Sequence, residues 1–438
     1  MPVTRAPLAL LAAAAVAAGC GGGADATTAP APARPADPAR PARPARSAPA
    51  SHDWPLFGRT PDRAGASPAG PGLRARTIGR LRRIGLTIPG TVDSSPIYLH
   101  DVRVRGARRD VFVVTTTYGR TLALDANDGR VLWTFTPRRI GSWQGSARIT
   151  NASPAADPGR RFVFTASPDG RVHRLSLAAG RESAGRWPVR VTRDPTHEKL
   201  TSSLNVAGRL LIVTTGGYIG DAPPYQGHVV TIDRAGGRIR GVFNSLCSDR
   251  HAIIDPRTCA STHSAIWARS GAVVEPRTRT LLVATGNGPF DGRTDWGDSV
   301  LRLSPDARRL LGHWTPPNQR ELEASDTDVG STGPVLAGGL VLQSGKDARI
   351  HVLTRRLRQV QELPAPGGAA MFSAPAVWRH GGRITVFAAT AGGAEAYAVR
   401  GGRLHPLWRH ATAGTSPVVA GGLLLVQDPG GGLVVYRA

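Results

Sequence analysis

The chain has 438 residues, a formal net charge of +24 and only two lysines, Lys199 and Lys346, among its 55 basic residues. Its arginines are spread along the chain and are not clustered with aromatic residues, so we expect no nucleic-acid binding from this charge. No segment beyond the N-terminal twenty residues is apolar enough to span a bilayer. The charge suits anionic lipid headgroups or an anionic envelope polymer instead.

The first predicted element is an export signal over residues 1–20. Arg5 supplies its positive start, and residues 8–18 form an apolar run that is too short to span a bilayer. The run ends in Ala-Ala-Gly-Cys, which resembles a bacterial lipobox, although Ala17 stands where that motif usually has leucine. We therefore expect a lipid on Cys20 that anchors the protein to the cell membrane on its extracytoplasmic side. The alternative is an ordinary secretory signal that is cut nearby.

Residues 21–52 consist mainly of glycine, alanine, proline and arginine. This segment offers no apolar face, and its prolines lack backbone donors, so we expect a disordered tether. Such a tether would hold the folded part of the chain, residues 53–438, close to the membrane.

From residue 53 onward one short pattern of strands recurs seven times. Each unit starts with serine or threonine, then a small residue or proline, then apolar residues. The seven starts are Asp-Ser-Ser-Pro-Ile-Tyr (93–98), "NASPAA" (151–156), "TSSLNV" (201–206), "SGAVVE" (270–275), "STGPVL" (331–336), "FSAPAV" (372–377) and "GTSPVV" (414–419). Each start is followed by an apolar strand, a glycine-containing turn and a third strand, and often by a weaker fourth strand with a tryptophan. This spacing predicts an all-β fold, a β-propeller with seven blades.

The two ends of the repeat region predict how the ring closes. The last unit ends at residue 438 without a fourth strand, and "LRRIGLTI" (81–88) is a strand that precedes the first unit. We expect residues 81–88 to pair with the final unit near residues 433–436, so that strands from both termini close the ring and leave no free sheet edge. Deletion of residues 1–75 should then be tolerated. The alternative is an eight-bladed plan, an open ring in which the eighth blade is missing.

The chain has three cysteines. With Cys20 assigned to the lipid, Cys247 and Cys259 remain, twelve residues apart. Outside the cytoplasm this spacing favours a disulfide that closes one loop. A shared metal is the weaker alternative, because no histidine or further cysteine flanks the pair at ligand spacing.

The stretch "GRTLALDANDGRVLW" (119–133) shows what one unit contains. Its Asn-Asp-Gly sequence at 127–129 predicts a tight turn between two strands, and Trp133 is expected to wedge between neighbouring blades. This "ALD…G…W" element and the lead-in "DWPLFGRTPDRAG" (53–65) resemble the PQQ-repeat β-propeller family over about residues 53–438. That family includes quinoprotein dehydrogenases and the propeller lipoprotein of the outer-membrane barrel-assembly machine.

The resemblance to quinoprotein dehydrogenases implies a set of site residues. Asn287 matches their calcium-binding asparagine, and Asp326 or Asp328 falls near the aspartate that binds the metal and acts as the base. Lys346 matches the cation that contacts pyrroloquinoline quinone (PQQ), and Trp267 lies near the tryptophan on which PQQ stacks. The resemblance thus implies PQQ and calcium as cofactors.

Two departures from the family pattern argue against that activity. Tyr218 stands where the family has its calcium-binding glutamate, and the chain has no adjacent pair of cysteines. Calcium needs six or more oxygen ligands with carboxylates among them, so the loss of one carboxylate should weaken the site greatly. We therefore expect a non-catalytic, monomeric scaffold at the cell envelope that binds a protein partner or an anionic envelope polymer. The alternative is a PQQ-dependent dehydrogenase that oxidises an alcohol or a sugar.

Overall fold

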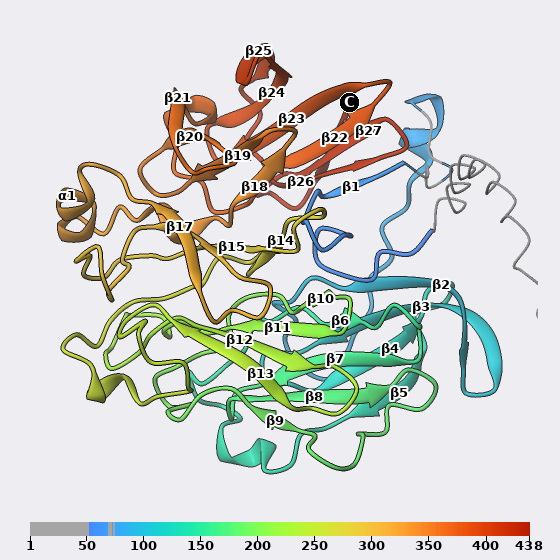
Figure 1. Cartoon of the computed structure of the whole chain (residues 1–438). Helices are drawn as coiled ribbons and strands as arrows, with labels where there is room; N and C mark the ends of the chain where they lie inside the picture. Colours follow the sequence, from blue (N-terminus) through green and yellow to red (C-terminus); the bar gives the residue numbers. More distant parts are fainter. Residues whose placement is uncertain (1–51, 69–71, 73–74) are drawn as a thin grey trace, which may run out of the picture. The chain divides into compact units, whose positions relative to one another are not determined.

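The computed structural model describes residues 52–68, 72 and 75–438. These residues form seven four-stranded sheets, the blades of a β-propeller (Figure 1). The all-β, seven-bladed fold predicted from the repeats is confirmed. The predicted signal peptide with Cys20, and all of the predicted tether except His52, lie outside the described residues.

Six blades are antiparallel meanders of four consecutive strands. Blade 1 holds β2 (Ile97–Val104), β3 (Ala107–Thr115), β4 (Thr121–Asp125) and β5 (Val131–Phe135). Blade 2 holds β6 (Ala155–Ala156), β7 (Phe162–Ser167), β8 (Arg171–Ser176) and β9 (Val189–Arg190). Blade 3 holds β10 (Asn205–Ala207), β11 (Leu210–Thr214), β12 (His228–Asp233) and β13 (Ile239–Asn244).

The remaining blades follow in chain order. Blade 4 holds β14 (Val273–Val274), β15 (Leu281–Ala284), β16 (Val300–Leu303) and β17 (Leu310–Trp314). Blade 5 holds β18 (Val335–Ala337), β19 (Leu340–Ser344), β20 (Arg349–Thr354) and β21 (Gln359–Pro364). Blade 6 holds β22 (Ala376–His380), β23 (Arg383–Thr390), β24 (Gly393–Arg400) and β25 (Arg403–His410). Blade 7 holds β26 (Thr415–Ala420), β27 (Leu423–Gln427) and β28 (Leu433–Arg437), joined by β1 (Ala66–Ser67).

Helices are short in the described part of the chain. The α-helix α1 (Gln319–Ala324) lies between blades 4 and 5, and 3-10 turns occupy Ala75–Arg80, Ile140–Ser142, Pro256–Thr258, Val329–Ser331 and Pro366–Gly368. None of the helices among these residues is long and apolar enough to cross a membrane.

The turn between β4 and β5 explains why the repeat motif has its sequence. Asp125 Oδ1 accepts a hydrogen bond from the Asn127 backbone N–H at 3.0 Å, and Gly129 has a left-handed φ of 75° that suits glycine. Trp133 then packs in the apolar cluster shared with blade 2, and its Nε1 donates to the Leu177 carbonyl at 2.8 Å. The expected roles of the turn and of Trp133 are thus found in the structure.

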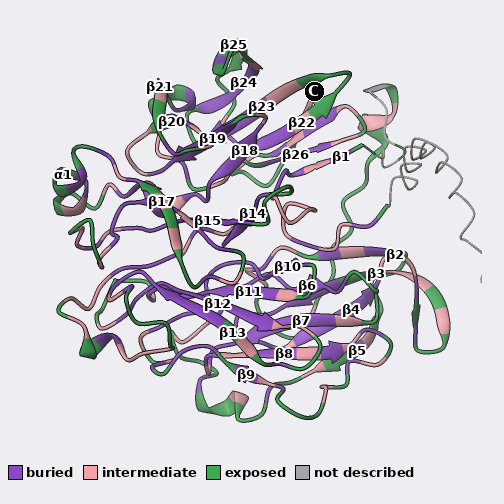
Figure 2. Ribbon diagram, in the orientation of Figure 1, coloured by how far each residue is buried: buried purple, intermediate pink, exposed green. Residues whose placement is uncertain are grey.

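Buried residues are concentrated in the strands of the blades (Figure 2). Apolar clusters join blade 1 to 2, 2 to 3, 3 to 4, 4 to 5, 5 to 6 and 6 to 7. Among the described residues no such cluster joins blade 7 to blade 1. A cavity of about 880 Å³ lies there, with Tyr98 and Phe112 on one side and Val418 on the other. This boundary, the seam, is therefore the least densely packed of the seven.

The ring closes differently from the sequence prediction. β1 pairs in parallel with β26, with Ala66 opposite Val419 and Ser67 opposite Ala420. Residues 81–88 form no strand, so the predicted partner of the final blade was wrong. Backbone contacts hold the chain just after this segment against blade 1, because Thr117 N donates to Thr91 O at 2.9 Å. The outer edge of β28 is therefore unpaired among the described residues.

The segment before β1 crosses the centre of the propeller. Its backbone carbonyls accept hydrogen bonds from the first strands of several blades, at Tyr98, Ala156, Val274, Val377 and Val419. The Asn205 side chain in β10 donates to the Pro61 carbonyl as well. Because one short segment contacts six first strands, those strands must surround it. We call residues 53–65 the central segment.

Arg63 holds the central segment in place. Its side chain is 3% exposed, and its guanidinium donates to the carbonyls of Phe57 at 2.6 Å and of Ser203 and Leu204 at 3.0 Å each. Deletion of residues 1–75 would remove these contacts together with β1, so we now expect that deletion to destabilise the propeller.

Candidate functional site

One face of the propeller gathers the loops that carry the predicted site residues. In an antiparallel blade the first strand begins, the second ends and the third begins at the same edge. The β15–β16, β17–β18 and β19–β20 connections therefore open on one face. They carry Asn287, Asp326, Asp328 and Lys346, while Trp267 lies on the β13–β14 connection.

Lys346 is the centre of this cluster. Its Nζ lies 2.5 Å from Asp326 Oδ1, 2.8 Å from Asp328 Oδ2 and 5.7 Å from the centroid of the Trp267 ring. Burial disfavours the positive charge, but the hydrogen bonds and the attraction of the two aspartates outweigh it and raise the pKa of Lys346. The predicted cation, acids and aromatic ring thus lie together.

The two aspartates have different surroundings. Asp326 is largely exposed, and the hydrogen bond from Lys346 lowers its pKa. Asp328 is fully buried, and this burial raises its pKa although it also contacts Lys346. One lysine therefore balances part of the charge of both carboxylates.

Two glycines allow the loops to approach so closely. A Cβ on Gly286 would lie 2.8 Å from the Trp267 ring, and a Cβ on Gly345 would lie 2.3 Å from the Asp328 carbonyl oxygen. Any larger residue would push the ring or the backbone apart. These glycines therefore bring Trp267, Asp328 and Lys346 within reach of one another.

Asn287 joins the cluster through its amide. Nδ2 donates to Asp326 Oδ1 at 2.6 Å, whereas Oδ1 is buried and has no hydrogen-bond partner. A buried acceptor without a donor is costly. Oδ1 is thus one oxygen that a cation could use.

Tyr218 lies on the β11–β12 connection, which opens on the same face. Its Oη donates to the Pro195 carbonyl at 3.0 Å, and burial raises its pKa to about 12, so the phenol is neutral at physiological pH. Lys199 Nζ lies 6.0 Å from the centroid of the Tyr218 ring. Both lysines of the chain therefore lie beside aromatic rings on the same face.

These residues do not fit a calcium ion. Calcium requires six or more oxygens with carboxylates among them, but Tyr218 supplies no charge, and Asp326 and Asp328 both contact Lys346. Within the described residues no group of three or more histidine, cysteine, aspartate or glutamate side chains could hold a metal ion. Asn287 Oδ1 and Asp328 Oδ1 are buried without a hydrogen-bond partner, but these two oxygens are too few for a calcium shell.

Sequence reasoning missed a second acidic group next to the first. Glu323, on α1, accepts from His263 Nε2 at 2.9 Å and from the Gly288 backbone N–H. Asp298 is fully buried; its burial, with the nearby charge of Asp328, raises its pKa to about 7. No motif marks these residues, because loops far apart in the sequence bring them together.

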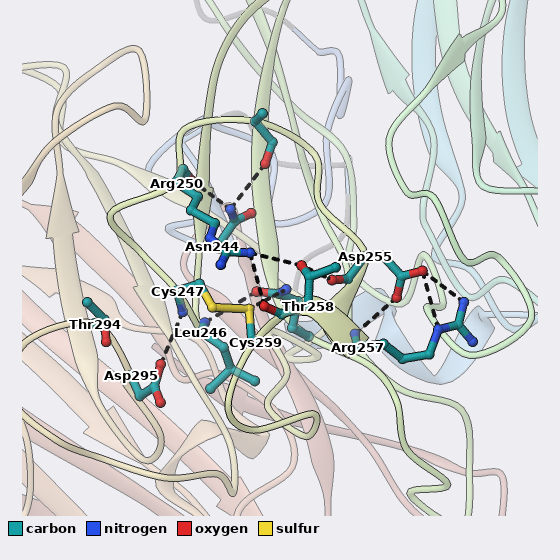
Figure 3. The surroundings of a disulfide bond; sticks show 12 residues. Asn244, Leu246, Cys247, Arg250, Asp255, Arg257, Thr258, Cys259, Thr294 and Asp295 are labelled. Carbon is teal, nitrogen blue, oxygen red and sulfur yellow. Dashed lines mark hydrogen bonds and ion pairs between the residues drawn. A yellow bond between two sulfur atoms is a disulfide. The ribbon is translucent and has the colours of Figure 1, made fainter.

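The predicted disulfide is present. Cys247 and Cys259 are bonded, with their Cα atoms 5.9 Å apart, in the β13–β14 connection on the same face (Figure 3). Asn244 holds the enclosed loop, because its Nδ2 donates to the carbonyls of Arg250 at 2.7 Å and Ala252 at 3.1 Å. The alternative of a shared metal is therefore excluded.

Comparison with known proteins supports the fold. Residues 91–249 match the family model described as "Outer membrane protein assembly factor BamB". A search of the curated proteins finds no match to the chain. The resemblance to the PQQ-repeat propeller family is confirmed by this match together with the solved structures.

Three solved structures are similar over 88% of this chain. They are quinohemoprotein alcohol dehydrogenase ADHIIG from Pseudomonas putida HK5 (TM-score 0.66, 14% identity, 71% of that chain), quinohemoprotein alcohol dehydrogenase from Comamonas testosteroni (0.63, 16%, 71%) and a europium-containing methanol dehydrogenase (0.61, 14%, 85%). At such identities the likeness is one of fold.

Proposed function

We propose that this PQQ-repeat propeller is a non-catalytic binding protein of the cell envelope, lipid-anchored through Cys20, that presents the loop face of its blades to a partner. One observation supports the proposal: Lys346 contacts both carboxylates of the cluster, and Tyr218, which the resemblance aligns with the calcium-binding glutamate of quinoproteins, is a neutral phenol. The two carboxylates that a metal would need are both engaged by Lys346, so they offer little net negative charge to a cation.

The similarity to the barrel-assembly family model supports a role in binding a protein partner at the envelope. A propeller suits such a role, because its loops form a broad surface on a rigid base. The disulfide between Cys247 and Cys259 fastens one of the longest of these loops. A disulfide agrees with an extracytoplasmic location.

The anchor is tested by fractionation. Wild-type protein should partition with membranes, and Cys20→Ser should give a soluble product or an uncleaved precursor. A wild-type protein that is soluble and begins beyond residue 20 would disprove the anchor.

A second candidate function is a PQQ-dependent dehydrogenase. The contact of Lys346 with Trp267 and the unpartnered oxygen of Asn287 favour this function. The chain also shares its fold with two proteins described as quinohemoprotein alcohol dehydrogenases. In that case Trp267 and Lys346 would be the residues that hold the quinone. The quinone would supply the hydride acceptor.

Calorimetric titration with PQQ in the presence of Ca²⁺ separates the two functions. We expect no saturable binding by the wild type and no alcohol- or sugar-dependent dye reduction. Saturable micromolar binding that is lost in Lys346→Ala would overturn the non-catalytic proposal. Tyr218→Glu adds the missing carboxylate and should raise Ca²⁺ affinity if the pocket is a decayed dehydrogenase site.

A further inference from the structure

A second cavity, of about 690 Å³, lies beside blade 2. Its size is within the range of small-molecule sites, about 300–1,000 Å³. Five arginines from separate parts of the chain line it: Arg138, Arg139, Arg148, Arg171 and Arg190. The first three come from the β5–β6 connection, and the last two come from β8 and β9. We call this cavity the arginine cleft.

The acidic residues of the arginine cleft are already engaged. Asp169 Oδ2 lies 3.3 Å from Arg171 Nε, and its Oδ1 accepts from Ser167 Oγ at 2.5 Å. Glu182 Oε1 lies 2.5 Å from His173 Nδ1. Two carboxylates therefore face five guanidinium groups. Asp169 already pairs with Arg171 and Glu182 with His173, so neither is free to neutralise the remaining four arginines.

Several of the arginines lack partners. Within the described part of the chain Arg138, Arg139 and Arg190 form no ion pair. Arg148 Nη2 donates to the Pro195 carbonyl at 3.3 Å, but its Nε is buried without a hydrogen-bond partner.

The register of blade 2 places two arginines side by side. Arg171 in β8 is directly opposite Arg190 in β9. Like charges in this position destabilise a sheet. An anion between them would turn this repulsion into attraction, because guanidinium groups bind oxyanions through paired hydrogen bonds.

The arginine cleft is not the active site of a hydrolase, although a serine, a histidine and a glutamate lie in sequence beneath it. Ser167 Oγ lies 2.7 Å from His173 Nε2, and His173 Nδ1 contacts Glu182, which is the order of a nucleophile, a base and an orienting acid. Ser167, however, is fully buried and donates its proton to Asp169. It cannot reach a substrate, so this network serves as the polar floor of the cleft.

We infer that the arginine cleft binds phosphate groups, either those of a soluble polyphosphate or the phosphodiester headgroups of an anionic lipid surface. Phosphate is favoured because its several oxygens can accept hydrogen bonds from arginines on different segments at once. The cleft is large enough for more than one such group. This inference goes beyond the proposed function and does not depend on it.

Sodium tripolyphosphate is the probe for the first experiment, with calorimetry on the full chain. We expect saturable binding to the wild type that becomes at least about tenfold weaker in Arg171→Gln/Arg190→Gln, since two charge-assisted contacts are lost. The matched control is Arg400→Gln/Arg403→Gln, because these arginines are also directly opposite in an antiparallel pair but are exposed and line no cavity described above. The control should bind like the wild type.

Thermal stability distinguishes loss of the site from loss of the fold. Without ligand, Arg171→Gln/Arg190→Gln should melt close to the wild type, because the repulsion that it removes offsets the loss of the partly exposed Arg171–Asp169 ion pair. If it fails to fold, Arg138→Gln/Arg139→Gln replaces it, since both residues are exposed on a loop. Equal loss of binding in the cleft and control variants, or no saturable binding by the wild type, would overturn the inference.

Two further arms identify the source of the phosphate. Binding to phosphatidylglycerol vesicles but not phosphatidylcholine vesicles, with displacement by tripolyphosphate, would support the lipid surface. Tripolyphosphate binding without vesicle binding would support a soluble ligand. Tighter binding of a polycarboxylate, such as polyglutamate, than of tripolyphosphate would overturn the assignment to phosphate.

Discussion

Replacement of Arg63 by methionine tests whether the central segment stabilises the propeller. Methionine fills part of the same space but donates no hydrogen bond. The carbonyls of Phe57, Ser203 and Leu204 would each lose a donor at 2.6–3.0 Å in a buried site.

The size of the effect follows from opposing contributions. Hydrogen bonds from a charged group contribute about 1.5–3 kcal/mol each, so three contribute about 5–9 kcal/mol. Methionine also removes a buried charge, whose desolvation costs several kcal/mol; this burial lowers the pKa of Arg63 to about 9. We expect a net loss of about 3–5 kcal/mol, as is usual when one partner of a buried charged contact is removed.

Differential scanning calorimetry at neutral pH measures this loss. An unfolding entropy of about 2.1 cal/mol/K per residue amounts to about 0.8 kcal/mol/K for roughly 390 residues, so Tm should fall by about 4–6 °C. The control is Arg83→Met, which alters an exposed arginine outside any strand. A Tm for Arg63→Met no lower than that of the control would refute the role assigned to Arg63.

Three more predictions concern stability. Removal of residues 1–51 should leave Tm unchanged, whereas removal of residues 1–75 should lower it and promote aggregation, because it deletes the central segment and β1; equal Tm values would contradict this. Replacement of Cys247 and Cys259 by serine should cost about 3 kcal/mol at most, by the chain-entropy estimate, and peptide mapping without reductant should find the two linked in the wild type. Asp298→Asn should raise Tm most above pH 7. The folded-state pKa of Asp298, about 7, exceeds its ordinary value of 3.8, so the native carboxyl keeps its proton where the unfolded one has lost it, and wild-type stability falls as pH rises from about 4 to 7. The Tm difference between Asp298→Asn and the wild type should therefore shrink as the pH is lowered through that window. The same Tm difference at every pH would disprove the raised pKa of Asp298.

Local patterns in the sequence predicted the blades well. The Asp125 turn and the position of Trp133 depend on residues within one repeat, and the same physical requirements recur in every blade. The pairing of Cys247 with Cys259 was also a local inference, over twelve residues.

Long-range contacts were beyond such reasoning. Arg63 binds carbonyls about 140 residues away, and backbone carbonyls leave no mark in the sequence. Residues 81–88 have the apolar content of a closing strand, but β1, only two residues long, takes that role. The residues around Lys346 were predicted from a family resemblance. Glu323 was not, because it lies on the short helix α1, which belongs to no repeat, and it contacts the backbone N–H of Gly288.

The seam also determines how the propeller would respond to mechanical tension on its N-terminus. A load applied before His52 reaches the backbone contact of Trp54 with Tyr98 first, and then the separate hydrogen bonds of the central segment, one blade at a time. Only afterwards does it reach the pairing of Ala66 with Val419. Each step breaks only a few bonds, so the force needed is low and the sheets stay intact. Tension would thus separate blade 7 from blade 1 at the seam before any blade unfolds.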